Sequence, residues 1–183
     1  PGGCYRAGCV IENQGRILVT GANGHLGRRL LARLASTGRP ARALVRSESA
    51  AQTLRRLPCA SAFEIQVADY NDRDSLAAAA EGCPCIVHLV GILKETRATR
   101  YADAHERTAE ALADAAARAG TKRIVYLSIL GSRAEDTNAC LSSKGRAEQI
   151  LLRGKVPVTV LQVPMVLGPG DIAANALRGQ ALA

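Results

Sequence analysis

The sequence predicts an α/β domain built on a doubly wound parallel sheet, in three layers with helices on both faces. Strand and helix patterns alternate along the chain, and most strand candidates are continuous apolar runs. Such runs are typical of strands that are buried on both faces of a parallel sheet. Aromatic residues make up only 3% of the chain against 48% hydrophobic residues overall, so Ala, Val, Leu and Ile must build the core.

Six strands and five helices are expected in alternation, with a ligand at the C-terminal edge of the strands. Several helices end at a glycine, which is a common residue just after a helix C-terminus. The strands are predicted over residues 16–20, 41–46, 63–67, 85–90, 123–128 and 158–163. The helices are predicted over residues 25–37, 48–57, 72–81, 101–119 and 140–153.

The 183 residues are enough for one domain with a buried core. Residues 1–14 are expected to form an irregular segment that precedes it. The longest apolar stretch, residues 85–93, is too short to cross a bilayer, and no secretory signal is visible. We therefore expect a cytoplasmic protein without a membrane span.

The net charge of +8 raises nucleic acid as a partner. The adjacent basic residues, however, form isolated pairs on different predicted elements, and aromatic residues for base stacking are nearly absent. Nucleic acid is therefore not expected as the main partner, and a charge-driven interaction role is only a third alternative. The six cysteines lack metal-site spacing, so we expect reduced thiols and no metal ion.

Three glycines at a three-residue spacing separate the first strand from the first helix. Gly21 permits a sharp turn, Gly24 lets the backbone approach a phosphate, and Gly27 lets the helix pack closely on the strand. The helix N-terminus then directs its amides and positive dipole end at an anion. This context favours a pyrophosphate site over a purely structural turn. The predicted cofactor contacts in this loop are Gly21, Asn23, Gly24, His25, Leu26 and Gly27.

In NAD-binding domains an acidic residue at the end of the second strand binds the adenosine 2′-hydroxyl. Here Arg46 stands at that position instead. A guanidinium can hold a 2′-phosphate through charge-assisted hydrogen bonds, so NADP is predicted over NAD. Arg28 is a candidate for a second positive group. The alternative is that Arg46 merely ends the strand in solvent.

Asp69 and Gly91 follow the third and fourth strands. The Asp69 carboxylate can accept a hydrogen bond from an adenine amino group, or it can equally form an N-cap or an Asx-turn before the next helix. Gly91 leaves room for the cofactor's ribose and phosphate. His88, within the fourth strand, is expected to be a satisfied buried histidine rather than a catalytic one.

Together these residues resemble the short-chain dehydrogenase/reductase superfamily in its extended or atypical branch. They are similar in particular to sugar-nucleotide epimerase/dehydratase-like proteins and to the NADPH-binding accessory subunit of respiratory complex I. The resemblance implies a Rossmann fold and a nicotinamide dinucleotide. It leaves open the small-molecule substrate and whether the protein forms a homo-oligomer or part of a larger complex. The matching segments are residues 20–27, 44–46, 69, 88–91, 126–128 and 163–171.

The resemblance also implies catalytic residues, because active members use a Ser after strand five and a Tyr-x-x-x-Lys on the next helix. Ser128 and Lys144 match two of these positions, but Cys140 stands in place of the Tyr. In the family the phenol exchanges a proton with the substrate oxygen, and the Lys holds the nicotinamide ribose. The sulfur would end roughly 3–4 Å short of a phenol oxygen, and a misplacement of about 1 Å can cost on the order of 100-fold in rate. General-acid help worth ~10²–10⁴-fold would then be lost unless another group or a water supplies it.

Two roles are open for Cys140. Lys144 and the nearby helix N-terminus favour a thiolate with a redox-sensing or nucleophilic role, whereas a small apolar filler beside the nicotinamide is the simpler interpretation. Tyr126, on the preceding strand, is expected to belong to the core.

Extended relatives carry a further substrate-binding lobe after the Gly-Pro-Gly-Asp turn at residues 168–171. We assign residues 15–172 to the dinucleotide-binding domain and expect residues 173–183 to begin a missing or vestigial lobe. Two function hypotheses follow. One is an NADP(H)-dependent oxidoreductase or epimerase-type enzyme with an atypical proton donor, and the other is a dinucleotide-binding structural subunit or sensor without turnover.

Overall fold

The structure is a computed structural model that describes residues 15–164 and 166. Its strands form one sheet in the order β3-β2-β1-β4-β5-β6, and every pairing is parallel, which confirms the predicted doubly wound architecture. The strands are β1 (Ile17–Thr20), β2 (Ala41–Val45), β3 (Phe63–Val67), β4 (Cys85–His88), β5 (Arg123–Ile129) and β6 (Val158–Val163).

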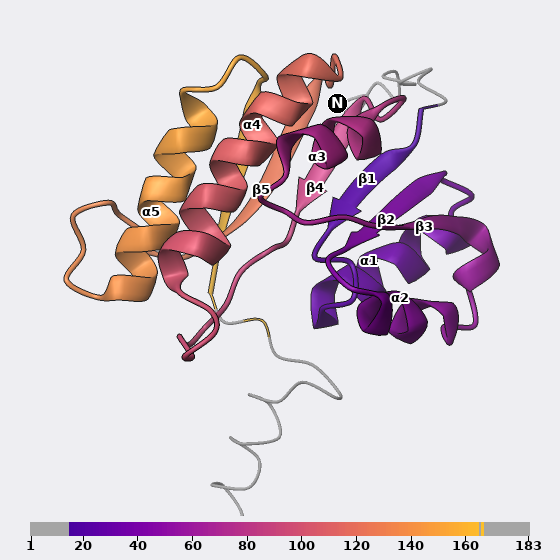
Figure 1. The fold of residues 1–183 in the computed structure, drawn as a ribbon, viewed down its shortest axis with the longest axis horizontal. Coiled ribbons are helices and arrows are strands. Elements are labelled where there is room, and N and C mark those ends of the chain that lie inside the picture. The colour runs from indigo at the N-terminus through magenta and orange to yellow at the C-terminus, as the bar shows by residue number, and fades with distance from the viewer. Residues whose placement is uncertain (1–14, 165, 167–183) are drawn as a thin grey trace, which may run out of the picture.

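Helices cover both faces of this sheet (Figure 1). Helices α1 and α2 pack on one face, and α3, α4 and α5 pack on the other. The helices are α1 (His25–Ser36), α2 (Glu48–Arg55), α3 (Arg73–Ala80), α4 (Thr108–Arg118) and α5 (Ala139–Leu152), with the short helices η1 (Ala60–Ala62) and η2 (Ala102–Arg107).

Each helix layer has its own apolar core, because successive side chains of a strand point to opposite faces. Leu18 of β1 joins the core under α3, α4 and α5, and its neighbour Val19 joins the core under α1 and α2. Both are fully buried. Burial on both faces explains why the strands are continuous apolar runs. Tyr126 is fully buried as well, as expected.

The element boundaries lie within two residues of those predicted, and two differences bear on the site. Strand β4 ends at His88, because Leu89 and Val90 leave the strand pairing and enter the wall of a cavity. The helix expected over residues 101–119 begins as the π-helix η2 and becomes α-helical only at Thr108. At the junction of the two helices, the Thr108 hydroxyl donates to the Ala104 carbonyl at 2.8 Å. Turns of π-helix are frequent at functional sites, and η2 borders the cavities described below.

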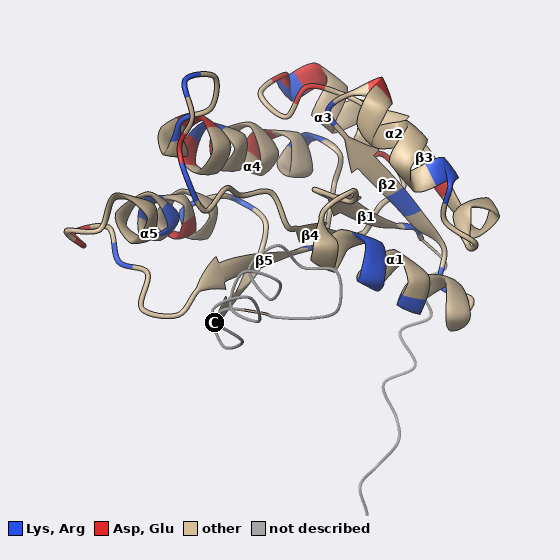
Figure 2. Ribbon diagram, turned by 90° about the horizontal axis from the view of Figure 1, so that it is seen from below, with Lys and Arg blue, Asp and Glu red and all other residues tan. Residues whose placement is uncertain are grey.

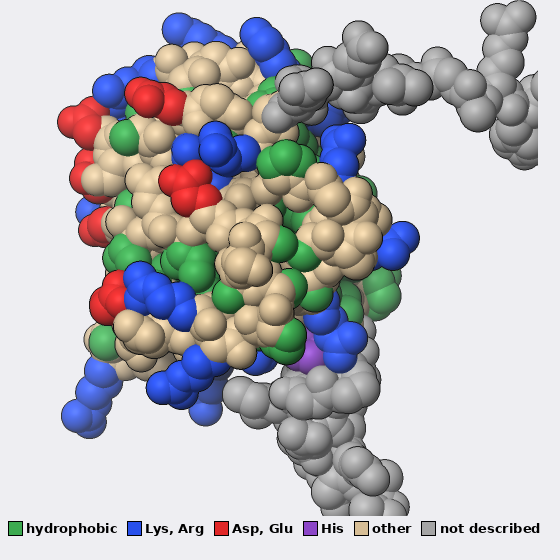
Figure 3. Space-filling model, turned by 90° about the vertical axis from the view of Figure 1, so that its right-hand side faces the viewer, with side chains coloured by type: hydrophobic (Ala, Val, Ile, Leu, Met, Phe, Trp, Pro, Cys, Tyr) green, Lys and Arg blue, Asp and Glu red, His purple; other side chains and the backbone are tan. Residues whose placement is uncertain are grey.

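The segment 1–14 and the residues from 167 onward lie outside the described residues. The irregular N-terminal segment, the turn at residues 168–171, the lobe from residue 173 and the domain bounds 15–172 therefore stay predictions. Among the described residues, no helix is long and apolar enough to cross a membrane. Helix α1 carries arginines and no acidic residue, whereas α4 and α5 carry both basic and acidic residues (Figure 2). Basic side chains are also scattered over the β3 end (Figure 3).

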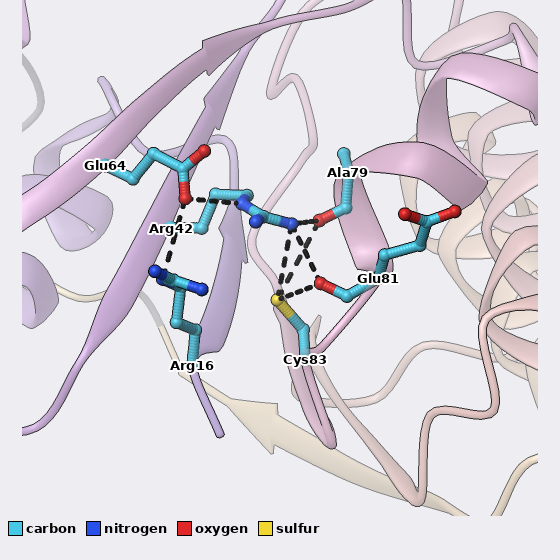
Figure 4. Close-up of polar contacts among 6 residues, drawn as sticks. All are labelled: Arg16, Arg42, Glu64, Ala79, Glu81 and Cys83. Carbon is cyan, nitrogen blue, oxygen red and sulfur yellow. Dashed lines mark hydrogen bonds and ion pairs between the residues drawn. The ribbon is translucent and has the colours of Figure 1, made fainter. Parts of the chain in front are cut away.

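A nearly buried arginine joins β2 to the end of α3 (Figure 4). Nη1 of Arg42 donates to the carbonyl oxygens of Ala79 at 2.6 Å and Glu81 at 3.0 Å, at the C-terminal end of the helix. Its Nε donates to Glu64 Oε2 at 2.9 Å. A cation at a helix C-terminus interacts favourably with the helix dipole, so Arg42 satisfies the last carbonyls of α3 and fixes this helix against the sheet.

Replacing Arg42 with Met should lower the free energy of unfolding by about 2–3 kcal/mol, because it removes the charged donor from the carbonyl of the buried Ala79. Arg16 is the matched control. It approaches the same Glu64 oxygen at 3.6 Å, but its side chain is 52% exposed against 12% for Arg42. Arg16→Met should therefore cost at most about 1 kcal/mol. Urea denaturation measures both losses, and equal losses would contradict the assignment of Arg42 to the helix end.

Candidate functional site

Two cavities open at the C-terminal edge of the sheet, and they share one wall. The β5-side cavity has a volume of about 380 Å³, and the β2-side cavity has a volume of about 400 Å³. The wall lies between β1 and β4, where the strand order reverses and where doubly wound sheets bind their ligands. The shared residues are Gly21, Gly24, Leu89, Val90, Gly91 and Ile92.

The glycine loop needs its glycines for different reasons. Gly21 has φ +68°, a conformation that L side chains rarely adopt. A Cβ at Gly27 would lie 2.5 Å from the Ala22 carbonyl oxygen, so only glycine lets α1 begin this close to the turn. A Cβ at Gly24 would meet only the Gly21 carbonyl oxygen, at 3.1 Å. The protein itself nearly tolerates a side chain at Gly24, which fits a ligand that approaches the backbone there.

Helix α1 begins at this loop without a side-chain cap. Its N-cap is Gly24, and its first turn contains no acidic residue. Uncapped amides and the positive end of the helix dipole attract an anion, so the residues present fit a pyrophosphate group. The walls of the two cavities together include the whole predicted loop: Gly21, Asn23, Gly24, His25, Leu26 and Gly27.

Tyr70 holds the loop in place, a role that sequence reasoning missed. The Gly21 N–H donates to Tyr70 Oη at 2.9 Å, and this phenol donates to the Leu44 carbonyl at 2.8 Å. Burial raises the pKa of Tyr70 to about 12, so the phenol keeps its proton at neutral pH. Because the Gly21 amide is used within the protein, an anion must bind the amides further along, at the start of α1.

The β2-side cavity has a polar wall. Arg46 is exposed on it, and Asp69 lines it from the end of β3. Asp69 Oδ1 accepts from the Asn71 N–H at 3.0 Å, so the Asx-turn forms while the residue stays on the cavity wall. The contact of Asp69 with adenine stays a prediction. Arg28 lines neither cavity.

Lys144 reaches the β5-side cavity from α5. Its Nζ donates to the Leu127 carbonyl at 2.8 Å and lies 4.2 Å from the centre of the Tyr126 ring. Burial, to 5% exposure, lowers the pKa of Lys144 to about 8. An ammonium has three N–H donors. The Tyr126 ring face and the Leu127 carbonyl each engage one, so one donor remains for a ribose hydroxyl.

Two buried histidines lie near this lysine. His88 Nδ1 shares a 2.7 Å hydrogen bond with Thr20 Oγ1, and His105 Nε2 accepts from the Ile92 N–H at 3.1 Å. Burial, assisted by the charge of Lys144, lowers the pKa of His88 to about 3 and that of His105 to about 4. Both rings are therefore neutral at pH 7. His88 is buried as expected, although its Nε2 has no hydrogen-bond partner among the described residues.

Ser128 lines the same cavity and hydrogen-bonds to Glu148, a residue that sequence reasoning missed. Gln162 Nε2 donates to both Glu148 carboxylate oxygens at 3.0 Å. Glu148 follows Lys144 by one helical turn, and this spacing was a signal that could have found it. Ser128 gives its proton to Glu148, so its oxygen stays available as an acceptor.

Cys140 lies half-buried at the start of α5, where its thiol donates to the Ile92 carbonyl at 3.7 Å. Burial raises the pKa of this thiol against the opposing effects of Tyr101 and Lys144. This disfavours the thiolate alternative. The cysteines in the described part of the chain are free thiols, and this part brings together no group of His, Cys, Asp and Glu that could hold a metal ion.

Comparisons with known proteins agree with this geometry. A family described as NAD(P)H-binding matches residues 21–177. The ceramide reductase of Caulobacter vibrioides is 28% identical over 162 residues, which are 88% of this chain and 50% of that protein. The 4-hydroxy-2-methyl-3-oxo-4-farnesyl-3,4-dihydroquinoline-1-oxide ketoreductase of Stigmatella aurantiaca is 31% identical over 182 residues, with 87% and 52% covered. The chain thus spans about half the length of these curated relatives.

Solved structures share the fold. The enzyme WbmG of Bordetella bronchiseptica in complex with NAD aligns with a TM-score of 0.69 at 22% identity, covering 91% of this chain and 60% of that one. The chain belongs to the NAD(P)H-binding family, as a Rossmann-like domain whose neighbours are epimerase/dehydratase-like and short-chain dehydrogenase/reductase-like proteins.

Proposed function

We propose that this domain binds NADP(H) and transfers hydride between its nicotinamide and a carbonyl or hydroxyl carbon of a small molecule. The observation that carries the proposal is the uncapped N-terminus of α1 between two cavities. A dinucleotide needs one space for each nucleoside and an anion site between them. The alternative, a dinucleotide-binding subunit or sensor without turnover, is favoured by Cys140 at the position of the family's tyrosine.

The polarity of the cavities orients the cofactor. The β2-side cavity, with Arg46 and Asp69, suits adenosine, and the β5-side cavity, with Lys144 and Ser128, suits nicotinamide. The bound nicotinamide supplies or accepts the hydride. With the cofactor bound, Lys144 would hold the nicotinamide ribose, the Ser128 oxygen would accept a hydrogen bond from a substrate hydroxyl, and Gly91 would leave room between the two cavities.

Arg46 supports NADP over NAD because its guanidinium is exposed on the adenosine side. We expect Arg46→Ala to weaken NADPH binding by about 10–50-fold, the equivalent of one charge-assisted hydrogen-bond pair, and to change NADH binding by less than about twofold. Fluorescence titration with both nucleotides measures this. Equal losses would contradict the 2′-phosphate assignment, and failure of the unaltered protein to bind either nucleotide would contradict the proposed function.

The lowered pKa of Lys144 predicts that NADPH binding is coupled to the uptake of a proton. Ribose oxygens and phosphates that accept from its ammonium favour the charged form, so binding raises a pKa that stands at about 8 in the free protein. At a pH near 9, NADPH binding should therefore take up as much as about one proton, and at pH 6 it should take up none. Calorimetry in buffers of different ionisation enthalpy measures the uptake. Lys144→Met should abolish it, and uptake that persists in this variant would assign the proton elsewhere.

Exposed leucines at the substrate end of the site favour an apolar substrate. Leu93 on the cavity wall is 71% exposed, and Leu130 beside Ile129 is 60% exposed. Two relatives point the same way, since one is a ceramide reductase and the other a ketoreductase of a farnesylated dihydroquinoline oxide. The apolar lining of this cavity consists of Leu89, Val90, Ile92, Leu93, Leu127, Ile129, Val163, Pro164 and Val166.

A series of straight-chain aldehydes tests the substrate class. With NADPH, kcat/KM should rise about three- to fourfold for each added CH₂ until the apolar wall is covered, because each buried CH₂ contributes about 0.8 kcal/mol. Leu93→Ser should flatten the series while the Kd for NADPH stays the same. A flat series with the unaltered protein, or a preference for a hydrophilic sugar aldehyde, would contradict an apolar substrate.

A further inference from the structure

We propose that the phenol of Tyr101 replaces the tyrosine that α5 lacks and donates the proton to the substrate oxygen. The inference rests on the proposed function. Tyr101 immediately precedes η2, and the segment that follows it contributes to both cavities, His105 to the β5-side cavity and Ala104 and Thr108 to the β2-side cavity.

The Tyr101 hydroxyl lies close to the start of α5 and to the cavity wall. It donates to the Leu93 carbonyl at 2.9 Å, and it is a hydrogen-bonding neighbour of the Cys140 thiol. That thiol also contacts the Ile92 carbonyl at 3.7 Å. Ile92 and Leu93 both line the β5-side cavity. Tyr101 itself lines neither cavity, but its hydroxyl is one hydrogen bond away from Leu93 on the wall of the β5-side cavity and neighbours Cys140, at the position of the family's tyrosine.

The ring of Tyr101 is held in a fixed orientation. It stacks on the His105 ring with 5.6 Å between centroids and 25° between planes. The Tyr101 backbone N–H donates to Glu95 Oε1 at 2.8 Å. His105 also accepts from the Ile92 N–H at 3.1 Å. The Tyr101 phenol, the His105 ring and residues 92–93 of the cavity wall are therefore connected to one another.

Direct contacts fix this unit relative to α5. Glu106 of η2 accepts from Ser143 Oγ at 2.8 Å and from Arg146 Nε at 2.8 Å. Ser143 immediately precedes Lys144, so these contacts set the position of the lysine relative to the segment that carries Tyr101.

The lysine and the imidazole unit converge on the cavity wall at Gly91. A Cβ at Gly91 would lie 3.5 Å from His105 Nε2 and 3.6 Å from Lys144 Nζ. His105, which stacks on Tyr101, and Lys144, which we expect to hold the nicotinamide ribose, thus both flank Gly91. This places the phenol on the nicotinamide side of the site.

The proton transfer balances as follows in the direction of reduction. The substrate carbonyl carbon accepts hydride from the reduced nicotinamide, and the carbonyl π pair moves to the oxygen, which takes the proton of Tyr101 Oη. The nicotinamide is left oxidised, and the phenolate regains a proton from solvent. Desolvation and the Cys140 thiol raise the pKa of Tyr101, so the phenol is protonated at neutral pH, the form that a general acid requires.

Tyr101→Phe tests the assignment, with apolar aldehydes and NADPH as the probes. We expect kcat to fall by at least about 100-fold, the contribution of a general acid, while the Kd for NADPH changes by less than about twofold. The double variant Tyr101→Phe/Cys140→Tyr returns a phenol to α5 and should recover much of the lost kcat, which loss of a merely structural contact would not allow.

Three results would overturn the assignment. In the first, Tyr101→Phe keeps its kcat. In the second, the variant loses kcat only in proportion to NADPH affinity. In the third, the unaltered protein binds NADPH and reduces no carbonyl, while Cys140→Tyr alone creates activity. Absence of NADPH binding in the unaltered protein would instead remove the proposed function together with this assignment, so the two failures are distinguishable.

Discussion

The close approach of α1 to the turn after β1 is the constraint on which the site depends. Gly27 has no Cβ, so the helix can start against the carbonyls of residues 21 and 22. Its uncapped N-terminus then lies at the boundary between the two cavities. A helix displaced by one side chain would aim its amides and dipole elsewhere, and the anion site would be lost. Tyr70 adds to this constraint by bonding the Gly21 amide to β2.

The electrostatics of the site differ at its two ends. On the β2 side, Arg46 is exposed and suited to a charged phosphate. On the β5 side, burial keeps His88 and His105 neutral and brings the pKa of Lys144 close to the physiological range. Hydride transfer proceeds best where water is excluded and few charges are fixed, so this asymmetry fits adenosine at one end and reaction at the other.

The parts of the fold that were predictable are those with a local physical signal. Burial on both faces makes the strands apolar runs, and the turn at Gly21 requires a conformation suited to glycine. The residues that sequence reasoning missed act through long-range contacts. Tyr70 bonds the Gly21 amide 49 positions away, and its own neighbours in the sequence give no sign of this.

The same limit applies to the catalytic end. The change at Cys140 was visible in the sequence, because it interrupts a family pattern. Tyr101, in contrast, reaches the start of α5 only after the crossover from β4 has placed η2 against that helix, and no local pattern indicates the π-turns of η2. Glu148 is the intermediate case, since its spacing from Lys144 was a usable signal.

The most direct test of the anion site at α1 is an NADPH titration of uniformly ¹⁵N-labelled protein, followed through the backbone amide resonances. Because the Gly24 N–H donates to the Gly21 carbonyl at 3.0 Å, we predict that the largest shifts occur at His25, Leu26 and Gly27, whose amides begin α1. Saturable binding that leaves these three amides unchanged while other regions of the protein shift would contradict the anion site at α1.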